Sequence, residues 1–474
     1  MSHRPNLLLI TTDQHRWDWL GCHGTPGVET PHLDALAGAG VRFTNHMTNS
    51  TVCVPARIGL ATGVAPVRLG TLGNDDVLPD TVPTYYQLLR DAGYRVGVVG
   101  KLDLNKPDAD NGRSGDRPDT YKWGFTDPVE VEGKMHARGE DGRPLGPYGW
   151  WLEERGLFAA FASDYEERIA DLWGRYLRAP ADPPYTGTRW YDDSILPTDA
   201  FEDIWIGRRA CQWLREVPDG SPFHLFVSFV GPHDPFDPPT EYAERFRDAP
   251  VPPPVLDRSD RRPFPITNLE YGHTEAQILT ARRQYTAALA AIDDQVGAII
   301  DTIRSEGLAD DTVILFSSDH GEMLGDHRLF QKSVAYEPAM RIPLIAAGPG
   351  VGSGVSDALT ELVDVTATIL DLVGLEVPTH FDGRTLAPVL ADPSLAHRDA
   401  VVSCETPFRA IRTPTKKYIH YLDEVYETDE LFDLADDPDE TRNLIEADPN
   451  EAARLHRRLV EILGEELAER PHPT

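Results

Sequence analysis

Cys53 and Arg57 lie four residues apart in the segment Cys53-Val54-Pro55-Ala56-Arg57. Pro is tolerated in the first turn of a helix, because its missing N–H has no intrahelical partner there. If a helix starts at this point, Cys53 and Arg57 share one face. An anion beside Cys53 would then meet exposed backbone N–H groups, the positive helix end and the Arg57 guanidinium. The alternative is a buried cysteine before an ordinary helix.

Two polar pairs, Asp13-Gln14 and Asp319-His320, each follow a short apolar run. They offer carboxylate oxygen, amide oxygen and imidazole nitrogen to one divalent cation. Taken alone, Asp13 can cap a helix and His320 can be a hydrogen-bonded structural histidine. Their joint placement favours a metal site, where the cation would neutralise an anionic substrate and polarise its central atom.

Three further side chains, Lys101, His233 and Lys332, supply the cationic or proton-donating groups that a bound ester dianion requires. Lys101 follows an apolar run, and His233 lies in the loop-like segment 232–236. For either lysine, an exposed surface position is the alternative. Because Lys101 ends a predicted buried strand, its context favours a place in the same site.

The elements that position these residues are four apolar runs typical of buried strands. They are Leu7–Ile10, Val96–Val99, His224–Val230 and Thr312–Phe316. In open α/β sheets, ligands bind beyond the carboxyl ends of the strands, so polar residues that follow the runs converge there. A helix packed on the sheet is predicted over Ala281–Arg304, where apolar residues recur at spacings of three and four.

Two stretches lie outside this pattern. The irregular segment from Asn105 to Pro197 carries five tryptophans, and we expect most of them to anchor the loop to the core. After the Asp382-Gly383-Arg384 segment the chain predicts a smaller unit, which contains the segment Lys417–Tyr421 and a helix at Asn450–Ala468. We therefore expect a catalytic domain at 1–392 and a C-terminal subdomain at 393–474.

Composition narrows the range of partners. The 474 residues include 45 basic and 77 acidic side chains, a formal charge of -32 that argues against general affinity for nucleic acid or anionic membranes. Four widely spaced cysteines favour a reducing compartment. The N-terminus lacks the pattern of a secretory signal, and no stretch is long and apolar enough to span a bilayer. We therefore expect a soluble cytoplasmic protein, with its oligomeric state left open.

The five-residue segment at Cys53 resembles the CxPxR pattern by which type I sulfatases and phosphonate monoester hydrolases have their cysteine oxidised to formylglycine. The resemblance implies that Cys53 is that residue and that a formylglycine-generating enzyme is its maturation partner. In such families one hydroxyl of the hydrated aldehyde is the nucleophile, and the other, once deprotonated, expels the sulfate or phosphate. An unconverted thiol could not perform this second step.

Further segments carry the same resemblance along nearly the whole chain. Residues 325–332 resemble the sulfatase pattern GDHxLxxK, residues 232–236 resemble PHxPF, and residues 430–444 resemble ELYDLxxDPxExxNL. The resemblance implies an alkaline phosphatase superfamily fold, α/β with a large mixed sheet flanked by helices and a small C-terminal α+β subdomain on an antiparallel sheet. It implies one metal on Asp13, Gln14, Asp319 and His320 beside Cys53, with Ca²⁺ favoured over Mn²⁺ or Mg²⁺.

Three positions separate this chain from typical sulfatases. Asp103 stands where these commonly have a histidine, and it is either a general base or a salt-bridge partner of Lys101 or Lys106. Ala56 and Asn74 instead resemble phosphonate hydrolases, with Asn74 in a substrate-binding position. Those enzymes tend to carry tyrosine and threonine at the positions of Lys101 and Asp103.

The expected reaction is hydrolysis of a small anionic ester, a sulfate monoester, with Arg57, Lys101, His233 and Lys332 gripping the substrate. The alternatives are a phosphonate monoester or phosphodiester hydrolase with the same machinery, and a catalytically silent binding protein in which Cys53 stays unconverted. Tetrahedral sulfuryl and phosphoryl groups place similar demands on a metal and on cations, so these residues alone leave the choice open.

Overall fold

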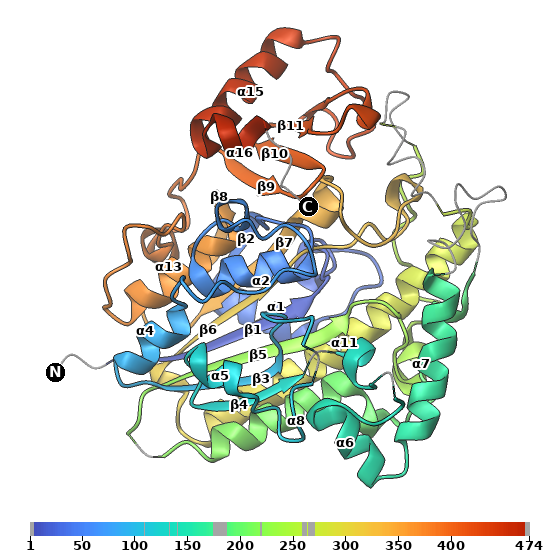
Figure 1. Cartoon of the computed structure of the whole chain (residues 1–474), viewed down its shortest axis with the longest axis vertical. Coiled ribbons are helices and arrows are strands. Elements are labelled where there is room, and N and C mark those ends of the chain that lie inside the picture. Colours follow the sequence, from blue (N-terminus) through green and yellow to red (C-terminus); the bar gives the residue numbers. More distant parts are fainter. Residues whose placement is uncertain are drawn as a thin grey trace.

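The computed structural model describes residues 4–108, 110–131, 133–139, 141–173, 187–218, 220–257, 263 and 271–469, the side chains of Met135 and Trp173 excepted. Within these residues an eight-stranded sheet has the order β4-β3-β5-β1-β6-β7-β2-β8 (Figure 1). Its strands are β1 Asn6–Asp13, β2 Val41–Met47, β3 Arg95–Lys101, β4 Asp127–Val131, β5 Phe223–Pro232, β6 Thr312–Ser318, β7 Arg341–Ala347 and β8 Gly354–Glu361. The four strands predicted from apolar runs are β1, β3, β5 and β6, four neighbours of this sheet.

The direction of the strands decides where the polar residues meet. β3 pairs parallel with β4 and β5, and β1 pairs parallel with β5 and β6. β7 runs antiparallel to both of its neighbours, β6 and β2. The sheet is therefore mixed, as predicted, and the carboxyl ends of β1, β3, β5 and β6 share one edge.

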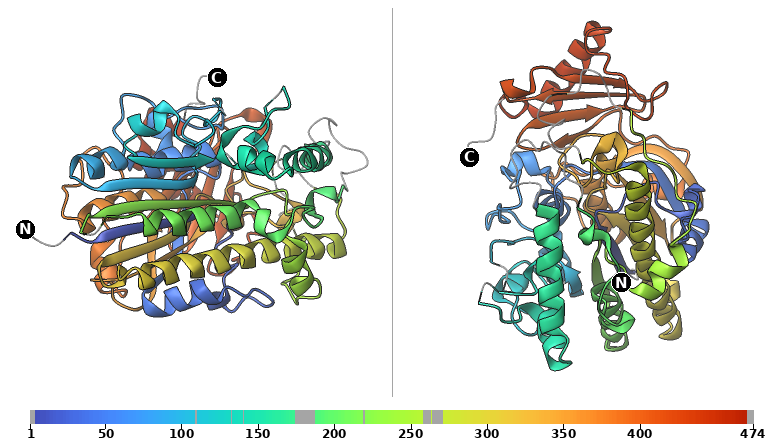
Figure 2. Two further views of the ribbon diagram at one scale, coloured as in Figure 1. Left: turned by 90° about the horizontal axis from the view of Figure 1, so that it is seen from below. Right: turned by 90° about the vertical axis from the view of Figure 1, so that its right-hand side faces the viewer.

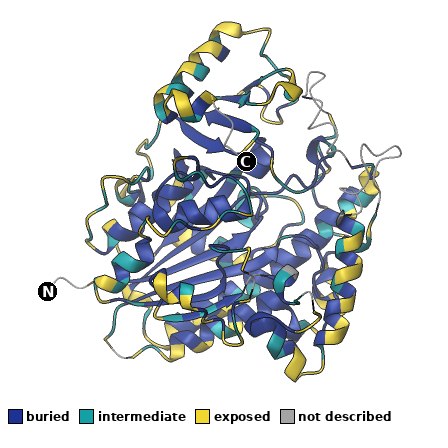
Figure 3. Ribbon diagram, viewed as in Figure 1, coloured by how far each residue is buried: buried dark blue, intermediate teal, exposed yellow. Residues whose placement is uncertain are grey.

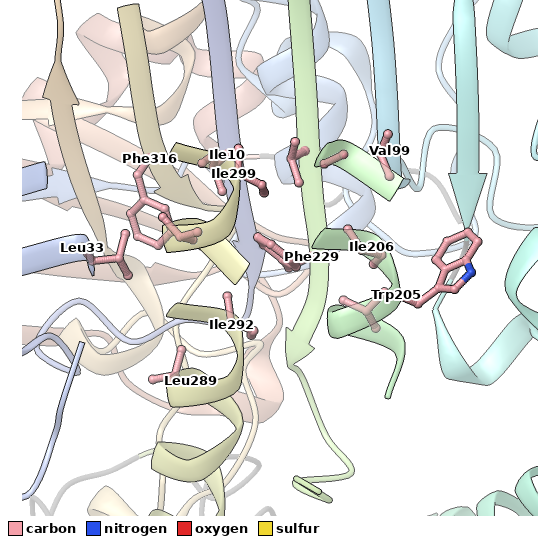
Figure 4. Packing of buried hydrophobic residues seen from close by; sticks show 14 of the residues in the cluster. Ile10, Leu33, Val99, Trp205, Ile206, Phe229, Leu289, Ile292, Ile299 and Phe316 are labelled. Carbon is pink, nitrogen blue, oxygen red and sulfur yellow. The ribbon is translucent and has the colours of Figure 1, made fainter. Parts of the chain in front are cut away.

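Helices cover both faces of this sheet (Figures 1 and 2). On one face lie α1 Pro31–Ala39, α8 Glu202–Arg215 and α11 Glu275–Ser305, and on the other lie α2 Cys53–Thr62, α4 Tyr85–Asp91 and α13 Leu362–Leu372. In Figure 4, Leu289 and Ile292 of α11 pack in the same cluster as Phe229 of β5 and Phe316 of β6. This packing explains the periodicity that predicted the helix.

Helix α11 begins six residues before the predicted start at Ala281. Thr274 and Gln277 form a capping box, in which the Thr274 side chain accepts from the Gln277 N–H and Gln277 accepts from the Thr274 N–H. Such a box satisfies two otherwise unpaired N–H groups and fixes the start of the helix. The first turns of α11 were missed because the prediction rested on the apolar stripe alone.

The predicted C-terminal unit is built on an antiparallel sheet with the order β12-β11-β10-β9. Its strands are β9 Val401–Cys404, β10 Phe408–Arg412, β11 Lys416–Tyr421 and β12 Glu430–Asp433. One face packs against helix α15, Pro449–Leu463, whose outer side is exposed (Figure 3). The opposite face contacts residues of the large unit, including Met47 and Met340.

The single C-terminal helix predicted over Asn450–Ala468 is wrong in one respect. Gly464 has φ 85° and separates α15 from a second helix, α16 Glu465–Glu469. This left-handed backbone is open to glycine at little cost and interrupts the helix. The chain therefore turns between α15 and α16.

The remaining α-helices of the described residues lie around these elements. They are α3 Pro66–Leu69, α5 Pro118–Lys122, α6 Gly146–Glu154, α7 Phe158–Trp173, α9 Thr240–Phe246, α12 Glu337–Met340 and α14 Ala387–Ala391. Of the tryptophans between 105 and 197, Trp123 and Trp190 are buried as expected for anchors, whereas Trp150 and Trp151 are half-buried. The side chain of the fifth, Trp173, lies outside the described residues.

All four cysteines are free thiols. Among the helices that the structure describes, none has the length and apolar character needed to cross a bilayer.

Candidate active site

Two neighbouring parallel strands bring the predicted metal ligands together. In the register of β1 and β6, Thr12 pairs with Ser318, so the residues that follow each strand are adjacent. The Gln14 N–H donates to Asp319 Oδ1 at 3.0 Å, and the backbone of Gln14 turns there with φ 67°. The strand ends therefore place Asp13-Gln14 beside Asp319-His320, as the sequence predicted.

The side chains of this group are arranged to suit a divalent cation. Ligand atoms of Asp13, Cys53, Asp319 and His320 all lie within 4.8 Å of one another, and all four residues are buried. His320 Nδ1 lies 3.0 Å from the carbonyl oxygen of Gly321. Because a carbonyl only accepts, Nδ1 carries the proton and the Nε2 lone pair faces the carboxylates. Metal-binding histidines are commonly held in this way.

Helix α2 begins at Cys53, with Pro55 in its first turn, which confirms the predicted helix start. The Val54 N–H at this end donates to Asn74 Oδ1 at 3.2 Å, so the Asn74 side chain lies beside the N-terminus of the helix. Cys53 Sγ lies 3.1 Å from His320 Nε2 and 3.8 Å from Asp13 Oδ1. The thiol therefore points into the group of candidate metal ligands.

Arg57, one turn further along α2, is 3% exposed and ties several elements together. Its Nε donates to Asp319 Oδ2 at 2.8 Å, and its Nη2 donates to Asp13 Oδ2 at 3.1 Å. Nη1 donates to the Lys101 carbonyl oxygen at 2.8 Å and to Ser228 Oγ at 2.9 Å. The Arg57 guanidinium thus links α2 to residues in or directly after four strands of the sheet, β1, β3, β5 and β6.

Lysines and a histidine surround the thiol on the remaining sides. Lys332 Nζ lies 3.3 Å from Cys53 Sγ, 2.7 Å from Gln14 Oε1 and 2.6 Å from His233 Nε2. Lys101 Nζ donates to Asp13 Oδ2 at 2.6 Å. Lys332 and His233 are partly exposed and Lys101 is buried, so the first two line the open side of the site.

Asp103 has the geometry of the salt-bridge alternative. Its Oδ2 lies 3.1 Å from Lys101 Nζ and 3.4 Å from Lys106 Nζ. The residue is fully buried and its backbone is left-handed, with φ 55°. The role of Asp103 as a general base stays a prediction.

The cations change the ionisation of the two central groups. Burial alone would raise the pKa of Asp13, but Lys101, His233, Arg57 and Lys332 hold it well below its ordinary value. Burial and the Asp13 charge would likewise raise the pKa of the Cys53 thiol, yet the ammonium groups of Lys332 and Lys101 bring it well below its usual range. The centre therefore stabilises negative charge at the position of the Cys53 side chain.

Three residues of this site, Asp234, Glu322 and Ser228, were not predicted. Gln14 Nε2 donates to Asp234 Oδ1 at 3.0 Å and to Glu322 Oε2, which directs its amide oxygen toward Lys332. Ser228 holds Arg57. Ser228 had a signal, as the one polar side chain in the apolar run 225–230. Glu322 follows His320 by two residues, but spacing alone gives it no distinct role.

A mixed sheet between two helical layers, with this polar centre at the strand ends, is the α/β architecture of alkaline-phosphatase-like enzymes. The model of the Sulfatase family matches residues 5–375, and that of the N-sulphoglucosamine sulphohydrolase C-terminal region matches residues 325–468. The chain therefore belongs to the sulfatase family, and it is a sulfuric ester hydrolase.

Individual relatives agree with this assignment. A choline-sulfatase of Rhizobium meliloti is 31% identical, with 94% of this chain and 83% of the relative covered. An arylsulfatase of Clostridium perfringens is 27% identical, with 94% and 91% covered. The crystal structure of a phosphonate monoester hydrolase of Agrobacterium radiobacter has a TM-score of 0.75 at 24% identity, covering 97% of this chain and 95% of that one. This last likeness concerns the fold alone.

Proposed function

We propose that this chain hydrolyses sulfate monoesters with a formylglycine made from Cys53 by a formylglycine-generating enzyme. The observation that carries the proposal is the position of Cys53 Sγ, 3.1 Å from His320 Nε2 and 3.3 Å from Lys332 Nζ. The side chain stands where the candidate metal ligands and the cationic groups meet. Formylglycine in this position would supply a hydroxyl nucleophile in place of the thiol.

Asp13, Gln14, Asp319 and His320 would hold one divalent cation. Two carboxylates and the Nε2 lone pair of His320 converge beside Cys53, which fits such an ion. Gln14 Oε1, 2.7 Å from the Lys332 ammonium group that contacts Cys53, would add a third oxygen donor, and oxygen donors favour Ca²⁺, with Mn²⁺ or Mg²⁺ as alternatives. When bound, the cation would act as a Lewis acid on the ester oxygens. Lys101 and Arg57 both donate to Asp13, which keeps its carboxylate ionised and oriented.

The remaining residues divide into two groups in this proposal. Lys332 and His233 line the open side, where they would bind the ester oxygens and supply a proton to the departing alcohol, and Asn74 lies beside them at the start of α2. Arg57 is buried with all three of its nitrogens engaged, so we assign it to positioning Asp13 and Asp319. Lys101 would face both the substrate and Asp13, with Asp103 fixing its ammonium group.

The direct test is a substrate panel on protein whose formylglycine content has been measured by peptide mass spectrometry. We expect sulfate monoester hydrolysis to rise in proportion to that content and to vanish in Cys53→Ala. Cys211→Ala, at a buried thiol of α8, is the matched control and should keep the activity. Unchanged sulfate and phosphate ester hydrolysis in Cys53→Ala would contradict the mechanism.

The panel also separates the alternatives. A phosphonate monoester or phosphodiester hydrolase with the same machinery would turn over these esters faster than matched aryl sulfates. A binding protein would keep the unmodified Cys53 thiol after expression with a maturation enzyme and would hydrolyse none of the esters. Either result would replace the proposed reaction.

A further inference from the structure

A second cluster of metal-binding side chains lies in the C-terminal unit, away from Cys53. It comprises His420 of β11, His456 of α15 and Glu469 of α16. One ligand atom from each residue lies within 4.8 Å of the other two. His456 Nε2 is 2.8 Å from Glu469 Oε1, and His420 Nε2 is 3.6 Å from Glu469 Oε2.

The cluster occupies one defined face of the small sheet. Residues on alternate positions of β11 face opposite sides, and Tyr418 and His420 lie on the side that packs against α15. The other side contacts the catalytic unit. The three side chains are 19%, 30% and 38% exposed in the order His420, His456 and Glu469, so an ion from solution can reach them.

Hydrogen bonds behind the two imidazoles fix which nitrogen carries the proton. His420 Nδ1 lies 3.0 Å from Asp429 Oδ2, and this carboxylate makes Nδ1 the donor. The Tyr418 hydroxyl donates its proton to Asp429 Oδ2 as well, so at 3.3 Å from His456 Nδ1 its oxygen accepts. Both Nδ1 atoms are therefore donors.

Both Nε2 atoms then face the Glu469 carboxylate. In the neutral imidazoles these nitrogens bear lone pairs, which would stand opposite carboxylate oxygens with no proton between them. Either protonation of the imidazoles or a metal cation between the three groups removes this conflict. Two imidazoles plus one carboxylate, each imidazole held from behind by a carboxylate or hydroxyl, is the arrangement found around zinc.

We propose that His420, His456 and Glu469 bind one Zn²⁺ ion, which fastens helix α16 to strand β11. The nitrogen and oxygen donors suit Zn²⁺ better than Ca²⁺ or Mg²⁺, which prefer oxygen alone. Three protein ligands leave the fourth tetrahedral position to water. The turn at Gly464 is what brings Glu469 back to the two histidines, because the ligands come from both sides of it.

The test measures zinc bound to the full chain after desalting, with Ca²⁺ in excess to occupy oxygen-rich sites. We expect wild-type protein to hold one equivalent of Zn²⁺ more than His456→Ala, while His380→Ala, at an exposed histidine outside the cluster, matches wild type. Replacing the second-layer carboxylate with Asp429→Asn should weaken zinc binding about 10- to 100-fold. Co²⁺ in place of Zn²⁺ should give a tetrahedral visible absorption band that His456→Ala lacks.

Glu469→Gln separates metal binding from folding, because its side chain is the most exposed of the three. We expect this variant to lose the extra zinc while its circular dichroism melt without metal matches wild type. Equal zinc content in wild type, His456→Ala and Glu469→Gln would overturn the proposal. It would leave the cluster as an ion pair between protonated histidines and Glu469.

Discussion

Arg57 Nε donates to Asp319 Oδ2 at 2.8 Å and so joins the first turns of helix α2 to the end of strand β6. Both side chains are buried, and the same guanidinium reaches Asp13. The candidate nucleophile and the candidate metal ligands come from distant parts of the chain, and this one contact sets their relative position.

Replacing Arg57 with lysine should disturb the position of Cys53 relative to Asp13 and Asp319. A single ammonium group cannot reach Asp13, Asp319 and Ser228 together, so we expect Arg57→Lys to lower kcat about 10²-fold, as misplacements near 1 Å do. Steady-state kinetics on an aryl sulfate measures this. Arg68→Lys, at a surface pair with Asp382, is the matched control and should remain within twofold of wild type, about 0.4 kcal/mol. Equal losses in both variants would count against the positioning role.

Lys332 and His233 should act as one unit. Their Nζ and Nε2 atoms are 2.6 Å apart, so removing either disturbs the other. We expect the kcat/KM losses of Lys332→Ala and His233→Ala to be non-additive in the double variant, with a coupling energy of about 1–3 kcal/mol. A second cycle pairing Lys332→Ala with Arg68→Ala should be additive to within about 0.5 kcal/mol. Additivity in the first cycle would mean that the two groups work separately.

Glu202 should make stability fall as the pH rises. The residue is 1% exposed at the start of α8, and neither carboxylate oxygen has a hydrogen-bond partner among the described residues. Burial, with the charge of Asp203, raises its pKa from 4.5 to about 8. The native state therefore holds this proton more tightly than the unfolded chain, and the stability it contributes below pH 4.5 is lost as the pH rises through 8.

Glu202→Gln removes this titration. We expect the variant to exceed wild type in free energy of unfolding at pH 9 by about 2 kcal/mol or more, since a tenfold change in proton affinity corresponds to about 1.4 kcal/mol. At pH 4.5 the two should agree. Urea denaturation at both pH values measures the difference. Glu241→Gln, in the exposed first turn of α9, should follow the pH dependence of wild type, and a Glu202→Gln curve parallel to wild type would refute the assignment.

Gly100 should be intolerant of a side chain. Its φ is 119°, and a Cβ placed there would lie 1.9 Å from the backbone carbonyl oxygen of Ser228 on β5. We expect Gly100→Ala to lower the free energy of unfolding by about 3 kcal/mol or more and to displace Lys101, with loss of activity. Gly93→Ala isolates the backbone cost, because Gly93 has φ 91° but open space, and should cost only about 1–2 kcal/mol. Similar melting temperatures for the two variants would show that β3 and β5 separate easily.

Much of the catalytic half was predictable because its signals are local. Apolar runs mark β1, β3, β5 and β6, and parallel strands oblige whatever follows them to converge. Strand β8 gave no such signal, since its first residues are exposed at the sheet edge and its sequence mixes Ser and Asp with apolar residues. Strand β2, with Arg42 and Asn45 among its residues, is similarly mixed.

Contacts between distant residues were the harder part. The pairing of Arg57 with Ser228 depends on the register between α2 and β5, which no local pattern reports. The cluster of His420, His456 and Glu469 has the same cause, because its members are 36 and 13 residues apart and follow no metal-binding spacing. The break at Gly464 was also missed, because the apolar pattern of α15 continues into α16 without interruption.

Cys53 is 0% exposed in the folded chain, at the bottom of a site lined by Lys332 and His233. A modifying enzyme would have to reach this side chain, which is buried in the folded chain. Under the proposed mechanism, oxidation of Cys53 would therefore come before α2 packs on the sheet. The contiguous Cys53-to-Arg57 segment suits this order of events, because a linear stretch is readable on a nascent chain whereas Asp13 and Asp319 are still far from it. In that mechanism, conversion of Cys53 would compete with folding, and faster folding would yield more unconverted protein.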